Sequence, residues 1–343
     1  MNSLLTRTFY SVAAMTVICA SVRAQPAPTQ TARVVSAANA FLATLDQKQR
    51  ASVSFAFDDE KQRTRWSNFP IRMVPRAGLS LGQLSDAQRE AALALVASAL
   101  SAKGYEKVQQ IMEGDEVLKN NDRGNAMFGK DLFFISIMGT PSEKDPWMLQ
   151  FGGHHLALNI TIVGEHGVLT PTLTAAQPAL FQLKGKTVRP LGQENDKAFA
   201  LLNALDETQK KQAILNYRVA DLVLGPGKDG KTIQPEGLKV SGMNEKQREM
   251  LLDLTSEWAA IVQDGFAAAR MAEIKADLDE TWFAWSGPTS VEPGKNGAAY
   301  YRIQGPRLVI EYAPQRMGGD PTMHIHTIYR DPTNDYGQRF TAK

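Results

Sequence analysis

The chain has 343 residues, of which 43% are hydrophobic and 22% are charged, a globular composition that excludes a chain disordered throughout. Lys and Arg number 38 against 36 Asp and Glu, and without a basic excess or stripe the nucleic-acid-binding class is excluded. No segment beyond the N-terminus has the ~18 consecutive apolar residues of a membrane helix.

Residues 1–24 have the pattern of a secretory signal peptide. Arg7 gives a positive start, a short apolar stretch follows from Phe9 to Val22, and the small residue Ala24 marks a cleavage position. We therefore expect a periplasmic or secreted protein in which residues 25–34 form a polar tether. The alternative is an uncleaved membrane anchor, although the apolar stretch is short for a span.

The cysteine content limits the chemistry of the exported chain. Cys19 is the only cysteine and lies inside the expected signal peptide, so the mature part has no disulfide, thiolate metal site or cysteine nucleophile. Lipidation of Cys19 is disfavoured because Ile18, which is not small, precedes it. Loss of Arg7 and Arg23 lowers the basic count from 38 to 36, equal to the 36 acidic residues.

Three sequence matches recur in the same order along the chain, and they predict an internal duplication of about 150 residues. They pair FLATLDQKQ at 41–49 with ALLNALDETQ at 200–209, GLSLGQLSDAQREAALAL at 78–95 with GLKVSGMNEKQREMLLDL at 237–254, and WMLQFGGHHLALNITI at 147–162 with AYYRIQGPRLVIEYAP at 299–314. The expected organisation is a first half at 35–180, a connector at 181–196 and a second half at 197–343.

Each half has the same expected order of elements: a helix, an irregular segment, a second helix and then strands. Apolar residues at helical spacing begin near Phe41, and Ser85 and Asn244 are the expected caps of the second helices. The expected strands are residues 132–138, 148–163, 282–285, 299–312 and 323–329. This order predicts an α+β fold of two similar helix–helix–sheet halves, packed with pseudo-twofold symmetry about a shared or abutting antiparallel sheet.

All five histidines lie in the expected sheet regions, at 154, 155 and 166 in the first half and at 324 and 326 in the second. Because side chains alternate along a strand, His324 and His326 should point to the same face with their rings within ~7 Å. By the same rule, His154 and His155 should point to opposite faces. Two histidines separated by one strand residue can offer both imidazoles to one metal ion.

These positions predict a single metal site between the two halves. The candidate ligands are His155, His324 and His326, with His154, Asn159 or Glu311 as the fourth ligand or as a supporting group. Three imidazoles and an open position suit a catalytic divalent metal, and we expect zinc ahead of copper or iron. Met317 and Met323 lie close in sequence and could supply a sulfur ligand, so copper remains a candidate metal. The alternative is that the histidines are buried polar residues that bond backbone groups between the halves.

Polar residues around the expected strands supply candidate catalytic groups. Arg330 is the candidate to clamp an anionic substrate group, and Asp331 or Asp335 would orient a ligand histidine or act as a general base. Glu311, on the polar face of its strand, completes the candidate catalytic set. The alternative is that Arg330 and Asp331 form a structural ion pair that fixes a turn.

No GxSxG elbow, P-loop, GxGxxG after a strand or HExxH motif is present, so serine hydrolases, kinases and dehydrogenases lack support. The segments QFGGHHLALN, GVLTPTLTAAQP and HIHTIYRDPTNDYG resemble the bacterial domain-of-unknown-function 3500 family over roughly residues 35–340. This resemblance implies a secreted protein and no established activity.

The leading hypothesis is an exported metal-dependent hydrolase that activates water at the interface of the halves and takes a small-molecule substrate. The alternatives are a copper or iron oxidoreductase, a non-catalytic periplasmic binding or metal-handling protein, and a duplicated scaffold whose histidines only join the halves. Neither nucleic acid nor stable membrane insertion after signal cleavage is expected.

Overall fold

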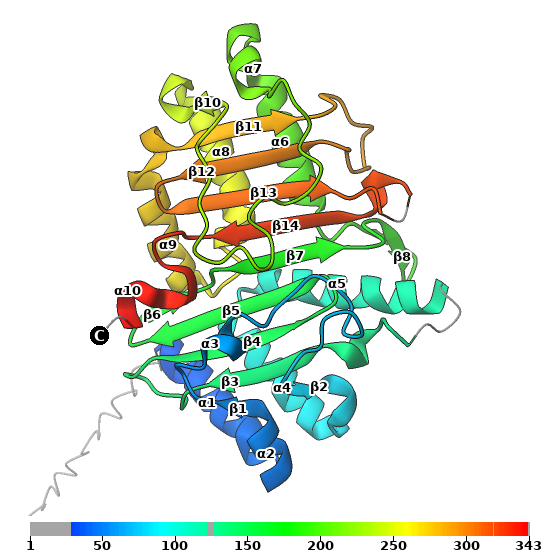
Figure 1. Cartoon of the computed structure of the whole chain (residues 1–343), viewed down its shortest axis with the longest axis vertical. Coiled ribbons are helices and arrows are strands. Elements are labelled where there is room, and N and C mark those ends of the chain that lie inside the picture. Colours follow the sequence, from blue (N-terminus) through cyan, green and yellow to red (C-terminus); the bar gives the residue numbers. More distant parts are fainter. Residues whose placement is uncertain (1–28, 122–125, 318, 342–343) are drawn as a thin grey trace, which may run out of the picture.

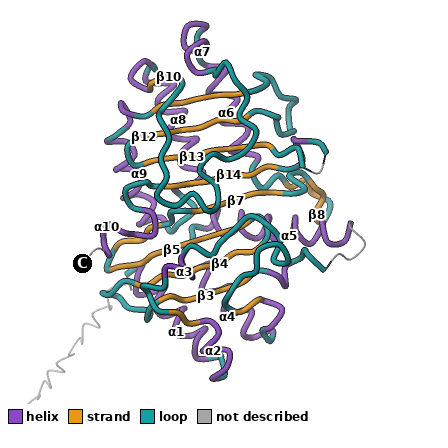
Figure 2. The backbone as a smooth tube through the Cα atoms, viewed as in Figure 1, coloured by secondary structure: helices purple, strands orange, loops and turns teal. Residues whose placement is uncertain are grey.

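The computed structural model describes residues 29–121, 126–317 and 319–341, so the expected signal peptide at 1–24 lies outside the described residues. The fold is α+β, as expected. Helices cover one face of a large sheet and long irregular segments cover the other (Figures 1 and 2). Residues 30–34, expected in the tether, instead begin the first helix, because Thr31 and Val34 are buried there.

The two helices expected in each half are present, and further helices that were not expected accompany them. In the first half they are α1 (Gln30–Ala43), α2 (Gln47–Val53), α3 (Glu60–Arg63), α4 (Asp86–Ala99) and α5 (Ala102–Asn121). In the second half they are α6 (Gly192–Ala204), α7 (Glu207–Ala213), α8 (Glu245–Ala259), α9 (Asp264–Ala276) and α10 (Gln338–Thr341). The corresponding helices also begin alike: capping boxes join Asp46 to Gln49, Asp206 to Gln209, Ser85 to Gln88 and Asn244 to Gln247.

A single 12-stranded sheet runs through both halves in the order β1-β3-β4-β5-β7-β14-β13-β12-β11-β10, with β2 on β3 and β6 on β5. The strands of the first half are β1 (Ser54–Phe55), β2 (Leu79–Ser80), β3 (Phe134–Met138), β4 (Trp147–Gly153), β5 (Leu156–Val163), β6 (His166–Val168) and β7 (Thr172–Ala176). Those of the second half are β10 (Leu238–Lys239), β11 (Trp282–Ser286), β12 (Tyr300–Gly305), β13 (Leu308–Pro314) and β14 (Ile325–Arg330). All pairs are antiparallel except β1 with β3.

The two halves join where β7 pairs with β14. Thr174 lies opposite Thr327 in this register, and their hydroxyl oxygens are 2.8 Å apart. The indole N–H of Trp258 donates to the same Thr327 hydroxyl at 2.9 Å, so helix α8 is fixed to this seam. The expected connector is partly regular, because it contains the hairpin of β8 (Phe181–Leu183) and β9 (Lys186–Val188) and the start of α6 at Gly192.

Two of the expected long strands are hairpins. Residues 148–163 divide into β4 and β5 around a turn at His154 and His155, and residues 299–312 divide into β12 and β13 around Pro306 and Arg307. The expectation that His154 and His155 alternate along a strand is therefore wrong. The turn has no Asn-Gly signature, and His155 itself adopts the left-handed conformation, with φ of 64°.

The sheet separates two kinds of packing. Two large apolar cores lie on its helix-covered face, one mainly from each half. A smaller core that includes Trp66, Met148, Ile328 and Tyr336 lies under the irregular segments on the other face. His326, Ile328 and Arg330 alternate with the core residue Tyr329 along β14, so they point toward these irregular segments.

Candidate metal centre

Three histidines from distant parts of the chain converge at one end of the seam. The Nε2 atom of His324 lies 3.1 Å from Nε2 of His155 and 3.0 Å from Nε2 of His326. One ring nitrogen of each residue lies within 4.8 Å of the other two. A tetrahedral ion with nitrogen ligands at ~2.1 Å separates its ligand atoms by ~3.4 Å, so small side-chain rotations suffice to fit the metal.

The backbone fixes each histidine from a different element. His155 stands in the β4–β5 turn, where its N–H donates to the Asn68 carbonyl oxygen and its own carbonyl accepts from Ala175 of β7. His326 belongs to β14, and His324 immediately precedes that strand in an extended conformation. The cluster therefore depends on the pairing of β5, β7 and β14 across the seam.

The outer nitrogens of the two strand histidines are held by polar groups. His324 Nδ1 donates to the Met317 carbonyl oxygen at 2.7 Å, which leaves the lone pair of Nε2 facing the cluster. His326 Nδ1 lies 3.6 Å from Asp221 Oδ1, which favours a proton on that nitrogen, and 3.5 Å from the amide donor Asn68 Nδ2, which opposes one. In the tautomer that Asp221 favours, the Nε2 lone pairs of His324 and His326 face each other across 3.0 Å, an arrangement that a bound cation would stabilise.

Burial lowers the pKa of two of these imidazoles, His155 and His324. His155, His324 and His326 are only 3%, 7% and 6% exposed. Burial, followed by the neighbouring histidines, holds the pKa of His155 well below its usual value. Burial and then the charge of His326 lower the pKa of His324 to about 4. At neutral pH both rings are therefore in the uncharged form that binds a metal ion.

His154 lies beside the cluster and packs against one of its members, His155. Its ring stacks on the His155 ring at a centroid distance of 3.6 Å, and its Nδ1 is 2.6 Å from Asp115 Oδ1 on α5. The group of converging nitrogens consists of the other three histidines, so His154 is a packing partner rather than a fourth ligand in this geometry. Asp115 thereby orients His155 through His154.

The turn that carries His155 is strained. A non-glycine residue with φ of 64° costs roughly 1–2 kcal/mol, and such residues concentrate at functional sites. The matching β12–β13 turn at Pro306 and Arg307 has no residue with positive φ. Of these two turns, only the one that presents the imidazole carries this cost.

Glu311 does not contact the histidines among the described hydrogen bonds. Its carboxylate accepts hydrogen bonds from the backbone N–H groups of Val223 and Leu224, at 2.9 and 2.7 Å, and from the Tyr300 hydroxyl at 2.7 Å. Burial raises the pKa of this carboxyl, while the three donors oppose the rise. Glu311 therefore holds the irregular segment 215–237 against β13 through these hydrogen bonds.

Arg330 is also fully engaged away from the cluster. Its guanidinium donates to the carbonyls of Leu224 and Gly225 and pairs with Asp229 and Asp335 at 3.1 and 2.9 Å. It stands four residues after His326, which on a strand is ~13 Å along the chain.

Asp331 follows at the end of β14, where it accepts from Thr333 and pairs with Arg270 at 2.8 Å. Arg330 and Asp331 therefore do not form the ion pair with each other that the alternative interpretation expected, because each pairs with other residues.

The polar neighbours of the cluster could not be found from the sequence. Asp115, Asp221 and Asn68 come from a helix and two irregular segments, and none lies in a motif with a histidine. Asn159, a candidate ligand, instead bonds Gln150 and the Pro171 carbonyl. Met317 contributes its carbonyl, while its side chain is 72% exposed, so its sulfur is not part of the cluster.

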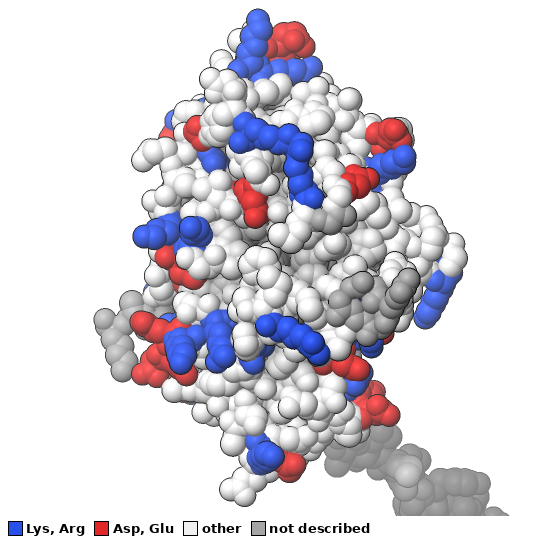
Figure 3. All heavy atoms as spheres, turned by 45° about the vertical axis from the view of Figure 1, so that its right-hand side comes forward, with Lys and Arg blue, Asp and Glu red and all other residues white. Residues whose placement is uncertain are grey.

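The fold and the cluster define an α+β protein with a three-histidine site at the seam of one continuous sheet. The chain belongs to the family described as "Protein of unknown function (DUF3500)", which matches residues 27–338 and confirms the resemblance. No curated protein and no solved structure matches it. Among the described helices, none is long and apolar enough to cross a membrane. Acidic and basic side chains are interspersed on the face drawn in Figure 3.

Proposed function

We propose that this protein binds one transition-metal ion through His155, His324 and His326. The observation that carries the proposal is the convergence of three buried ring nitrogens, with His324 Nε2 3.0 and 3.1 Å from the other two. The outer nitrogens of His324 and His326 meet a carbonyl and a carboxylate, which is the usual support of a metal-ligating histidine.

We further propose that the metal is zinc and that the reaction is hydrolysis. A divalent ion held by three imidazoles keeps a coordination position open, and zinc in that position supplies Lewis acidity and activates water. Asp221 is the candidate proton acceptor, because its side chain contacts His326 and is also 61% exposed. Burial raises the pKa of Asp221, but hydrogen bonds from His326 and from the N–H of Leu222 lower it overall, so the carboxylate is ionised at neutral pH.

Glu311, Arg330 and Asp331 maintain the fold in this proposal. Two of them bind the segment 223–225 to the sheet, and this segment begins two residues after Asp221. Their effect on the metal centre is therefore to hold the irregular segment that presents Asp221.

A non-catalytic metal-handling protein is the second candidate, and the deep burial of all three imidazoles favours it. A copper or iron oxidoreductase receives less support. Imidazole suits both metals, but the Met317 side chain, whose sulfur was a candidate copper ligand, is largely exposed.

Hydrolysis is tested with zinc-loaded protein and an activated ester such as p-nitrophenyl acetate. We expect turnover that a chelator removes, that added zinc restores and that His326→Ala abolishes. Stoichiometric zinc without turnover on ester, phosphoester and amide probes would reject hydrolysis in favour of metal handling. A protein that takes up no metal would overturn the proposal as a whole.

We also propose that the halves arose by duplication, with Gly78 and Gly237 in equivalent roles. Both have φ of 95°, and a Cβ would lie 2.3 and 2.2 Å from the carbonyl oxygens of Ile135 and Phe283. We therefore expect Gly78→Ala and Gly237→Ala each to lower the unfolding free energy by about 2–4 kcal/mol. Gly265→Ala, with open space at its Cβ, is the control and should not destabilise the protein. A large difference between the first two variants in chemical denaturation would argue against equivalence.

A further inference from the structure

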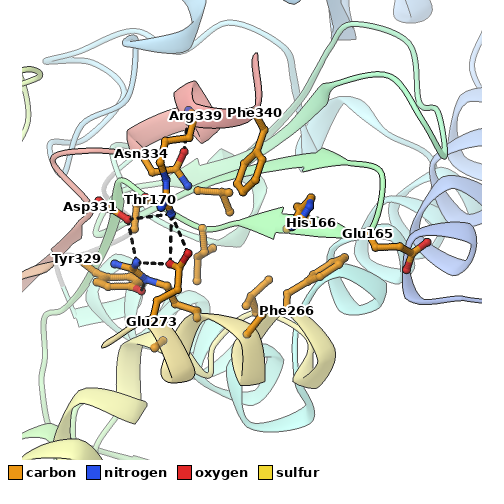
Figure 4. Close-up of a pocket in the computed structure, with 17 residues that line it drawn as sticks. Glu165, His166, Thr170, Phe266, Glu273, Tyr329, Asp331, Asn334, Arg339 and Phe340 are labelled. Carbon is orange, nitrogen blue, oxygen red and sulfur yellow. Dashed lines mark hydrogen bonds and ion pairs between the residues drawn. The ribbon is translucent and has the colours of Figure 1, made fainter. Parts of the chain in front are cut away.

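Three arginines on the segments around the metal centre have no partner of their own. Arg72, Arg218 and Arg316 are exposed, and their guanidinium groups make no hydrogen bond or ion pair with any described residue. Every other arginine in the described part of the chain has such a partner. At the far end of β14, for example, Arg339 contacts both carboxylate oxygens of Glu273 (Figure 4). The three arginines are therefore an exception that a ligand would explain.

The first of them belongs to an irregular segment that is strongly basic. Arg72 lies four residues after Asn68, whose carbonyl oxygen accepts a hydrogen bond from the N–H of His155. Residues 61–85 contain five basic side chains and no acidic one. Three further arginines of this segment donate to backbone carbonyls, which leave their positive charge uncompensated: Arg63, Arg65 and Arg76. This side of the metal centre is therefore positively charged.

The other two arginines lie equally close in sequence to groups that contact the cluster. Arg218 precedes Asp221 by three residues, and the Asp221 carboxylate lies beside the outer nitrogen of a cluster histidine. Arg316 directly precedes Met317, whose carbonyl oxygen binds His324. Three separate segments thus each contribute one group that contacts the cluster and one arginine without a partner.

The acidic groups of these segments are already engaged within the protein. Asp221 Oδ1 accepts a hydrogen bond from Gln315 Nε2 at 2.8 Å. Glu236 pairs with Arg302 at 2.9 Å, and Asp320 accepts from a backbone N–H and from a hydroxyl group. Because the carboxylates have internal partners and the three arginines have none, the groups left for a ligand are mainly cationic.

Large apolar side chains stand beside the same arginines. Four are exposed among the described residues: Phe69, Met73, Tyr217 and Met317. Met73, Tyr217 and Met317 are direct sequence neighbours of the three arginines, and exposed apolar groups that gather in one region mark interaction sites. Tyr217 and Arg218 also line an open hollow of about 590 Å³ that extends to Asp221, a volume in the range of small-molecule sites.

We propose that Arg72, Arg218 and Arg316 form an arginine rim that binds an organic anion with an apolar part, and that this anion is the substrate of the metal centre. The second statement rests on the hydrolysis proposed above. Guanidinium groups bind carboxylate and phosphate through paired, charge-assisted hydrogen bonds, and the exposed apolar side chains contact the hydrocarbon part. Arg330, to which the sequence assigned this role, is buried and paired elsewhere.

Binding is tested apart from catalysis by saturation-transfer NMR, recorded with and without zinc. The probes are phenyl phosphate and benzoate as anions, benzyl alcohol as a neutral molecule and benzylamine as a cation. We expect the anions to bind best, with an affinity that falls as salt is added, because the arginines are exposed. The combined variant Arg72→Gln, Arg218→Gln and Arg316→Gln should weaken anion binding roughly tenfold. It should keep its thermal stability, because these side chains have no internal partner.

A second combined variant removes the same charge elsewhere. Lys48→Gln, Lys211→Gln and Lys246→Gln change exposed lysines on α2, α7 and α8, and α2 and α7 lie at opposite ends of the molecule (Figure 1). This variant should bind the anions as the wild type does. Preference for the neutral or cationic probe, unchanged anion binding in the arginine variant, or an equal loss in the lysine variant would overturn the proposal. Binding to phosphatidylglycerol vesicles without binding to phenyl phosphate would also overturn it, in favour of a lipid surface.

Turnover separates the rim from the chemistry of the metal. Zinc-loaded protein should hydrolyse mono-p-nitrophenyl succinate with a kcat/KM roughly tenfold above that for p-nitrophenyl acetate, and the arginine variant should lose this preference. Anion binding that depends on the three arginines, without turnover of either ester, would confirm the rim and reject the substrate role together with hydrolysis. Turnover without preference for the anionic ester would support hydrolysis and overturn the rim as its substrate site.

Discussion

His324→Ala and His326→Ala should each reduce metal affinity by more than about 100-fold, because even loss of an outer partner of a ligand costs 10–100-fold. Wild-type protein should be recovered from the periplasm, should begin at Gln25 and should contain about one equivalent of metal by elemental analysis. Zinc at about 100 times its Kd should raise the unfolding free energy of the wild type by about 2.7 kcal/mol. Neither histidine variant should show this gain.

The chain offers its own control for this experiment. His166 lies outside the cluster, on β6, where its ring packs against Phe340. His166→Ala should therefore bind metal as the wild type does. Equal metal loss in all three variants would mean that uptake is adventitious, and full retention in His324→Ala would contradict the assignment of this ligand.

Arg330→Met should lower the free energy of unfolding by about 3–5 kcal/mol, the cost of breaking a buried ion pair. Arg330 is 1% exposed, its guanidinium lies 5.5 Å from the Trp66 ring centroid, and its removal leaves Asp229 and Asp335 without their shared cation. The carbonyls of Leu224 and Gly225 also lose their donor. Urea denaturation monitored by tryptophan fluorescence measures the change.

An exposed ion pair supplies the comparison. Arg248 pairs with Asp279, whose side chain is 67% exposed, so Arg248→Ala should change the unfolding free energy by at most ~1 kcal/mol. If Arg330→Met were equally mild, the contacts of Arg330 with residues 224–229 would have no large energetic role. Loss of metal affinity in Arg330→Met would further show that these contacts help to position Asp221.

Local patterns in the sequence predicted much of the fold. The caps at Ser85 and Asn244 were correct because a capping box is encoded within four residues. The turn at His154 and His155 was missed because turn prediction relies on Gly, Asn and Asp, whereas here His155 accepts the left-handed conformation. The tether was placed too far along the chain because Gln30 to Val34 carry few apolar residues, although Thr31 and Val34 pack into the core.

The candidate site was predictable only as far as its histidines. The spacing of His324 and His326 placed two imidazoles on one strand face, and strand geometry is local. The partners Asp115 and Asp221 come from α5 and from an irregular segment, and their approach depends on tertiary packing. The sequence predicts catalytic roles for Arg330 and Asp331 because polar residues are dense at the end of β14. The structure instead turns them toward the segment at 223–229 and toward Arg270, respectively.

Anomalous X-ray scattering from crystals of the zinc-loaded protein, recorded on both sides of the zinc absorption edge, tests the central claim most directly. We predict one edge-dependent peak at ~2.0–2.1 Å from the Nε2 atoms of His155, His324 and His326. A peak located only at surface residues, or no peak between the three imidazoles in protein that diffracts well, would contradict the metal assignment.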